Sequence, residues 1–157
     1  MAYYVRIFCA SSEVPTLTSI ASWVATKGVR LDIVPVRGGI DSRDWSEAEV
    51  SQAGRAVRFH VEVNRVDASS EIALKEIDEF REMVLATPES ASRQEVLDHL
   101  ARTKFIVANR IPTGAFEGAD YDALGYFCEF FIVHAGGMVQ ADGEGFYRGK
   151  ELILPLR

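Results

Sequence analysis

AVRFHVEVNRV, residues 56–66, shows the most regular two-residue alternation in the chain. Its apolar side chains are Val57, Phe59, Val61 and Val63, and the polar ones between them are Arg58, His60, Glu62 and Asn64. Successive side chains of a strand point to opposite faces, so the pattern predicts a strand with one buried and one polar face. WSEAEVSQ, residues 45–52, precedes it and is predicted to be the first arm of the same hairpin.

The flanking sequence alternates between strand-like and helix-like patterns. Before the hairpin we expect a strand, a helix that begins near Pro15 and ends at Gly28, and a second strand. After it, apolar residues at helical spacing predict a helix over 70–86, and SRQE, Ser92–Glu95, fits a capping box that opens the next helix. KFIVANRI, residues 104–111, fits a strand or a continuation of that helix, and we favour the helix.

The stretch HAGGMVQADGEGFY, residues 134–147, contains four glycines, two carboxylates and a histidine. It follows a long apolar segment that predicts a buried helix, with Asp120 capping its start and Gly136 its end. We interpret the stretch as a helix cap followed by a hairpin, and ELILPL as the final strand. Asp142 and Glu144 are secondary candidates for a binding site there.

Together these elements predict one α+β domain spanning residues 1–157. The strand, helix, strand, hairpin and helix at its N-terminus suggest a ferredoxin-like unit, with further C-terminal helices and a hairpin completing a two-layer fold. A helical crossover between the first two strands would place them in parallel, so we expect a mixed sheet.

Tests of known motifs predict neither a cofactor nor a metal site. A calcium loop starting at Asp142 would need Gly and Glu where Tyr147 and Ile153 stand. The glycines of 134–147 close a helix rather than open one, unlike a dinucleotide fingerprint, and RGGIDS lacks the lysine of a phosphate-binding loop. No two of the three histidines are three or four residues apart. His99 is expected on a solvated helix face.

The polar face around His60 is the main candidate for binding. Arg58 and Glu62 share that face, and Arg6 and Asp32 join them if the first strands lie in the same sheet. A histidine between Arg and Glu could act as a general base, but no motif supplies a nucleophile. Trp45 follows a polar loop, so we expect it to be partly exposed and to contribute to binding.

Charge and composition narrow the classes of partner. The formal net charge of -6 disfavours nucleic acid and suits a basic protein partner. No segment has the length of a membrane span, and the N-terminus resembles a strand rather than a signal peptide, so a cytoplasmic protein is expected. Cys9 and Cys128 match no disulfide or metal pattern and are predicted to be core residues.

Four stretches carry a resemblance to known proteins: DW before the hairpin, VRFHVEVNR, and the closing GGMVQADGEGFY and ELIL. With these stretches the chain resembles a group of small bacterial α+β proteins with no assigned activity. The resemblance spans residues 44–154 and implies a bacterial, cytosolic protein, which would fit an accessory or immunity-like role.

The sequence is therefore compatible with three functions. The first is a non-enzymatic module that binds a protein partner through the face of Arg58, His60 and Glu62 or the loop from Asp41 to Glu49. The second is a small-molecule enzyme or sensor, which predicts a pocket holding His60 or the pair Asp142 and Glu144. The third is a structural homo-oligomer, for example a homodimer, in which the mixed strand faces and Trp45 are self-association contacts.

Overall fold

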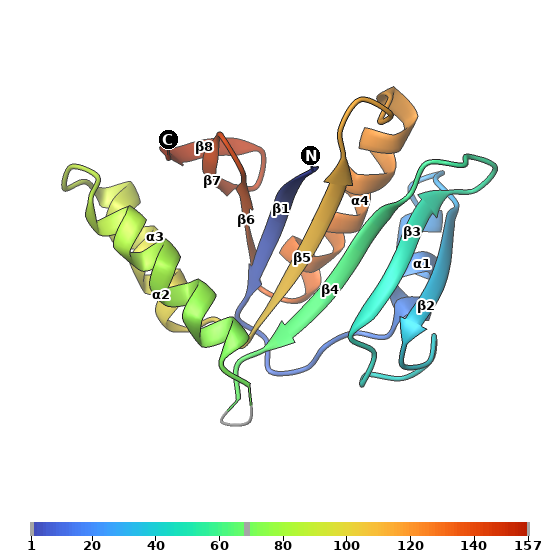
Figure 1. Ribbon diagram of the computed structural model, residues 1–157, viewed down its shortest axis with the longest axis horizontal. Helices are drawn as coiled ribbons and strands as arrows, with labels where there is room; N and C mark the ends of the chain where they lie inside the picture. Colours follow the sequence, from blue (N-terminus) through green and yellow to red (C-terminus); the bar gives the residue numbers. More distant parts are fainter. Residues whose placement is uncertain (1, 68–69, 157) are drawn as a thin grey trace.

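The computed structural model describes residues 2–67 and 70–156, which form four helices and one eight-stranded sheet (Figure 1). In chain order the elements are β1 (Ala2–Cys9), α1 (Leu17–Ala25), β2 (Leu31–Arg37), β3 (Glu47–Gln52), β4 (Phe59–Arg65), α2 (Ile72–Leu85), α3 (Ala91–Ala101), β5 (Phe105–Pro112), α4 (Gly118–His134), β6 (Gly137–Ala141), β7 (Gly145–Arg148) and β8 (Glu151–Pro155). The α+β class is confirmed.

The sheet is antiparallel throughout, in the order β2-β3-β4-β5-β1-β6-β7-β8. The prediction of a mixed sheet is therefore wrong. β1 and β2 run in the same direction, but β5, β4 and β3 lie between them, so the helical crossover does not create a parallel pair. Without that pair, the ferredoxin-like unit is not confirmed.

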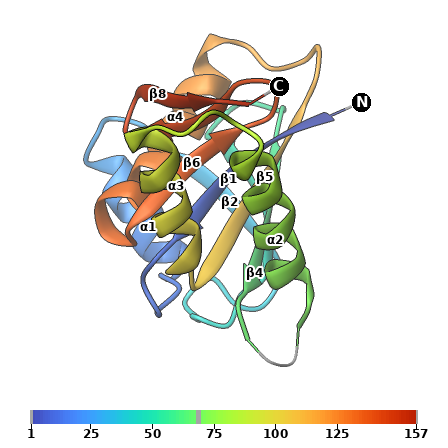
Figure 2. The same cartoon turned by 90° about the vertical axis from the view of Figure 1, so that its left-hand side faces the viewer.

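Helices cover both faces of the sheet, so the two-layer arrangement is not confirmed either. Figures 1 and 2 show α1 and α4 against one face and α2 and α3 against the other. One apolar cluster lies under α1 and α4, around Ile7, Val61, Val107 and Phe127. A second lies under α2 and α3, around Phe8. β1 therefore contributes alternate side chains to two cores.

The alternation in β4 is confirmed, because Phe59, Val61 and Val63 are buried under α4 while the residues between them face the other way. The prediction of helix over 104–111 is wrong, because this segment is β5 at the centre of the sheet. Its side chains are buried on both faces, which removes the alternation that identifies a half-exposed strand.

Three local predictions about the helices are corrected. Ser90, not Ser92, caps α3 and accepts a hydrogen bond from the Arg93 amide. Asp120 does help to cap the start of α4, but from the first turn, where its carboxylate accepts from the amide of the N-cap residue Glu117 in a capping box. His99 is buried rather than solvated, and its Nε2 lies 2.7 Å from the Phe8 carbonyl oxygen.

The stretch 134–147 forms the end of α4, strand β6 and a tight turn into β7, as the helix-cap and hairpin interpretation predicts. Gly145 shows why glycine is required there. Its φ is +139°, and a Cβ atom at this position would lie 2.1 Å from the Leu154 carbonyl oxygen of the neighbouring β8. This glycine serves close strand packing rather than a ligand.

Candidate functional site

Part of the sheet carries polar side chains on a face that the helices leave uncovered. The cluster under α2 and α3 takes its strand residues from β1 and from β5 to β8, and none from the described residues of β2, β3 and β4. In Figure 1 these three strands lie toward the right, away from the pair α2 and α3 on the left, and no helix lies in front of them. We call this surface the open face; alternation and strand register place on it Asp32, Val34, Val36, Glu47, Glu49, His60 and Glu62.

Strand register brings four of these residues together. In the antiparallel pair of β3 and β4, Glu49 lies opposite His60 and Glu47 lies opposite Glu62. Directly opposite residues in such a pair have Cβ atoms roughly 4.5–5.5 Å apart, so their side chains meet on the same face. The sheet thus surrounds one imidazole with three carboxylates.

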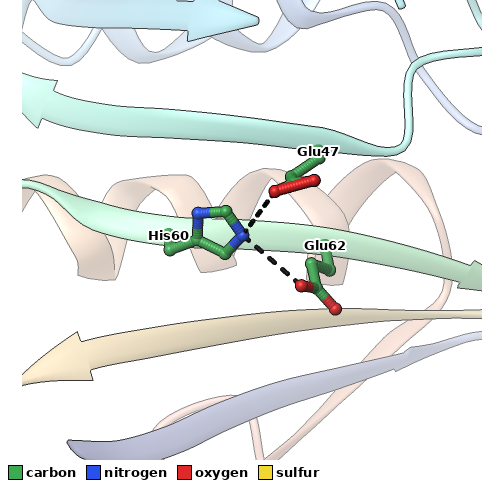
Figure 3. Close-up of side chains that lie close together, drawn as sticks. All are labelled: Glu47, His60 and Glu62. Carbon is green, nitrogen blue, oxygen red and sulfur yellow. Dashed lines mark ion pairs between the residues drawn. The ribbon is translucent and has the colours of Figure 1, made fainter. Parts of the chain in front are cut away.

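The ring of His60 contacts all three carboxylates, and Figure 3 shows two of these contacts, to Glu47 and Glu62. Its Nδ1 lies 2.6 Å from Oε1 of Glu49, while its Nε2 lies 3.2 Å from Oε1 of Glu47 and 3.4 Å from Oε1 of Glu62. The His60 side chain is 14% exposed and that of Glu62 is 54% exposed, so the cluster opens toward solvent on the Glu62 side. Arg37 binds the second oxygen of Glu47 at 3.1 Å.

The two ring nitrogens of His60 face different numbers of carboxylates. Nδ1 lies 2.6 Å from Oε1 of Glu49 and donates to it in the tautomer that carries a proton on Nδ1. Nε2 then faces two further acceptors, Glu47 and Glu62. Such an arrangement is favourable only if a proton or a metal ion lies between Nε2 and the two oxygens. The ligand atoms of Glu47, His60 and Glu62 all lie within 4.8 Å of one another, so these residues could hold a metal ion.

The structure separates the other predicted site residues. Asp32 lies on the open face near its edge, and Arg58 is exposed just before β4. Trp45 is fully buried, and its indole N–H donates to the Pro15 carbonyl at 2.8 Å. The prediction of a partly exposed Trp45 is therefore wrong, and this residue belongs to the core.

Arg6 points to the same side of the sheet as His60 but lies beneath α2. Its guanidinium binds Glu76 at 3.1 Å, Asp142 at 2.7 Å and Gln140 at 2.9 Å. Burial raises the pKa of Glu76 by more than the Arg6 charge lowers it. Burial also opposes ionisation of Asp142, but hydrogen bonds from Arg6 and from the Tyr4 amide outweigh it and lower the pKa. This network ties α2 to β1 and β6.

Glu144 lies on the other side of the sheet from Asp142, so the two secondary candidates do not form a joint site. Glu144 lines a half-open groove of about 670 Å³ between α4 and the strands β6 and β7. Tyr147 donates a short hydrogen bond to Glu144, which raises the pKa of the tyrosine. Among His60, Asp142 and Glu144, only Glu144 lines this groove.

The sequence predicts Glu47 and Glu49 within the first hairpin arm, 45–52, but marks them for binding only as part of the loop from Asp41 to Glu49. Both lie in β3 and supply two of the three carboxylates around His60. A usable signal was present, because Ala48 and Val50 are apolar and alternate with Glu47, Glu49 and Ser51. Extending the alternation of the second hairpin arm to the first would have placed the two glutamates on the His60 face.

Comparisons with known proteins add no assignment. A scan against protein-family models found no match to this chain, and searches of curated proteins and of solved structures found none either. Within the described residues, no helix has the length and apolar character needed to cross a membrane.

Proposed function

We propose that this chain is a non-enzymatic binding module whose open face binds a protein partner. The observation that carries the proposal is the combination of uncovered strands and concentrated charge, with four carboxylates, Asp32, Glu47, Glu49 and Glu62, on one face. Charge complementarity favours a partner that presents basic side chains, which also suits the formal net charge of -6.

Apolar groups beside these carboxylates support binding to a protein rather than to a small cation alone. Val34 and Val36 on the edge strand β2 are 44% and 52% exposed. Protein interfaces commonly surround a small apolar patch with a polar rim. The partner surface would therefore combine apolar contact with the valines and basic groups toward the carboxylates.

The surroundings of His60 favour binding over nucleophilic catalysis. The ring contacts Glu47, Glu49 and Glu62, which are all acceptors. A histidine that activates a nucleophile instead needs a serine or cysteine side chain within hydrogen-bond distance. The geometry therefore supports recognition of a cationic group.

A pair of matched double variants tests this function. Asp32→Lys with Val34→Lys reverses charge and removes apolar surface on the open face while Glu47, His60 and Glu62 stay unchanged. Because Val34 lies opposite Glu49, the new lysine also occupies a carboxylate that the partner would use. Asp122→Lys with Val133→Lys makes the same changes on exposed positions of α4, on the opposite side of the sheet. The tagged wild-type chain would be used to capture a partner from a lysate of the source organism, and the purified partner would be titrated against all three proteins.

The proposal expects a stoichiometric partner that protects the β2–β4 amides from hydrogen exchange. Its affinity should fall at least tenfold for the open-face variant and less than twofold for the α4 variant. Equal effects of the two variants, protection of a different surface, or the lack of any stoichiometric partner would overturn it. If the protein self-associates with rising concentration and only the open-face variant abolishes this, the partner of the open face is a second copy of the chain.

A further inference from the structure

We propose that Glu47, His60 and Glu62 bind a divalent transition-metal ion, with Zn²⁺ as the ion to test. The inference deepens the proposed function, and it rests on that function only for what completes the coordination shell. The metal would lie at the centre of the open face, between β3 and β4.

The distances around Nε2 match those between ligands of one metal ion. Ligands about 2.0–2.1 Å from a tetrahedral zinc ion lie roughly 3.3–3.5 Å from each other. Nε2 of His60 is 3.2 Å from Glu47 Oε1 and 3.4 Å from Glu62 Oε1. Charge-assisted hydrogen bonds are shorter, at about 2.7–2.9 Å, and one N–H cannot point at two oxygens equally well. Both distances from Nε2 therefore fit a shared cation, and the remaining pair, the oxygens of Glu47 and Glu62, lies within 4.8 Å.

Glu49 and Arg37 complete the arrangement from outside the ligand set. Metal-binding histidines usually donate their second N–H to a carboxylate, which fixes the ring and leaves the other nitrogen free. The 2.6 Å contact between Nδ1 and Glu49 meets that requirement. Arg37 engages Oε2 of Glu47 and leaves Oε1, the oxygen nearest His60, for the ion.

The ligand set indicates the class of metal. One imidazole with two carboxylates suits zinc and its first-row neighbours, whereas calcium and magnesium prefer shells made only of oxygen. Three protein ligands leave a fourth position open. Since Glu62 is half-exposed, that position faces solvent, where a side chain of the partner could fill it. After the ion neutralises Glu47 and Glu62, Asp32 and Glu49 remain available to basic groups.

The test is titration of the full, chelator-treated chain with Zn²⁺ alone by isothermal calorimetry, with Co²⁺ absorption to report the coordination geometry. One ion should bind per chain, and Co²⁺ should show a tetrahedral spectrum. Glu62→Gln and His60→Gln should each weaken the affinity at least tenfold, while Glu49→Ala should weaken it about 10–100-fold without removing a ligand. Glu62 is the safest position for folding because of its exposure, and Glu144→Gln on the far side is the matched control.

Either of two results would overturn the metal site. One is wild-type affinity for Zn²⁺ no stronger than that of Glu62→Gln; the other is a nuclear magnetic resonance titration in which both ring nitrogens of His60 stay protonated in excess Zn²⁺. Partner capture with zinc-loaded and chelated protein separates the two proposals. Zinc binding with no partner at the open face would refute the proposed function but not the metal site. Partner binding there with no zinc site would refute the metal site but not the proposed function.

Discussion

Replacing Trp45 by phenylalanine should destabilise the protein by about 2–4 kcal/mol, because this side chain belongs to the core. The indole is fully buried, and its N–H donates to the Pro15 carbonyl at 2.8 Å. Removing the donor leaves the partly buried Pro15 carbonyl without that partner, at a cost of about 1–3 kcal/mol. The smaller ring also leaves a cavity on the order of 40 Å³, which adds about 1 kcal/mol at roughly 24 cal/mol per Å³.

Trp23→Phe provides the matched control. Trp23 is only partly buried and packs edge-on against Phe130 and His134, contacts that a phenylalanine can largely keep. Its replacement should cost less than about 1 kcal/mol. Equilibrium unfolding in urea, followed by circular dichroism, measures both variants on the same scale.

The accessibility of Trp45 to a quencher also tests whether this residue belongs to the core or to an interface. Its fluorescence, recorded in the Trp23→Phe background, should resist quenching by acrylamide in the native protein. A Trp45→Phe variant that loses less than 0.5 kcal/mol, or a Trp45 that acrylamide quenches freely, would refute the packing argument. It would also return this residue to the surface role that its position after a polar loop suggests.

Two further predictions concern buried positions. Burial, aided by the charge of Arg102, lowers the pKa of His99, so the unfolded state binds a proton more readily as pH falls below the ordinary value of 6.5. The wild type should therefore lose more unfolding free energy than His99→Gln between about pH 7 and pH 5 in urea titrations, and equal losses would contradict this. Gly145→Ala should cost more than about 2 kcal/mol, because its Cβ would overlap the Leu154 carbonyl, whereas Gly125→Ala in α4 meets open space and should gain about 0.5–1 kcal/mol. The reverse order of the two glycine variants would refute the strand-packing argument.

The sequence predicts elements well where one face is buried and the other is solvated. β4 and α2 are such elements, and their apolar residues recur at the expected spacing of two or of three to four. The prediction fails for β5, which lies at the centre of the sheet with helices on both sides, because its first four residues, 105–108, are apolar on both faces. It fails for His99 as well, since the buried carbonyl that this side chain meets belongs to Phe8, 91 residues away.

The candidate site could be predicted only in part. His60, Glu62 and Asp32 follow from strand alternation, and the structure places all three on the open face. Their meeting with Glu47 and Glu49 depends on the register of the hairpin, and six residues, 53–58, separate its two strands. Short two-residue turns fix the register by their geometry, but a connection of this length does not. The position of Arg6 beneath α2 similarly depends on a helix 70 residues away.

Core packing, rather than the charges themselves, holds the four residues of the cluster together. Ala48 and Val50 of β3 are fully buried under the same helices as Phe59 and Val61. A slip of one residue in β3 would exchange these apolar side chains for glutamates and bury carboxylates in the core. Burial therefore fixes the register, and the register places three carboxylates around His60, where Arg37 on Glu47 and Arg110 opposite the histidine offset only part of their mutual repulsion. A bound cation, whether from a partner or a metal ion, would relieve that repulsion, which is the physical reason to expect one there.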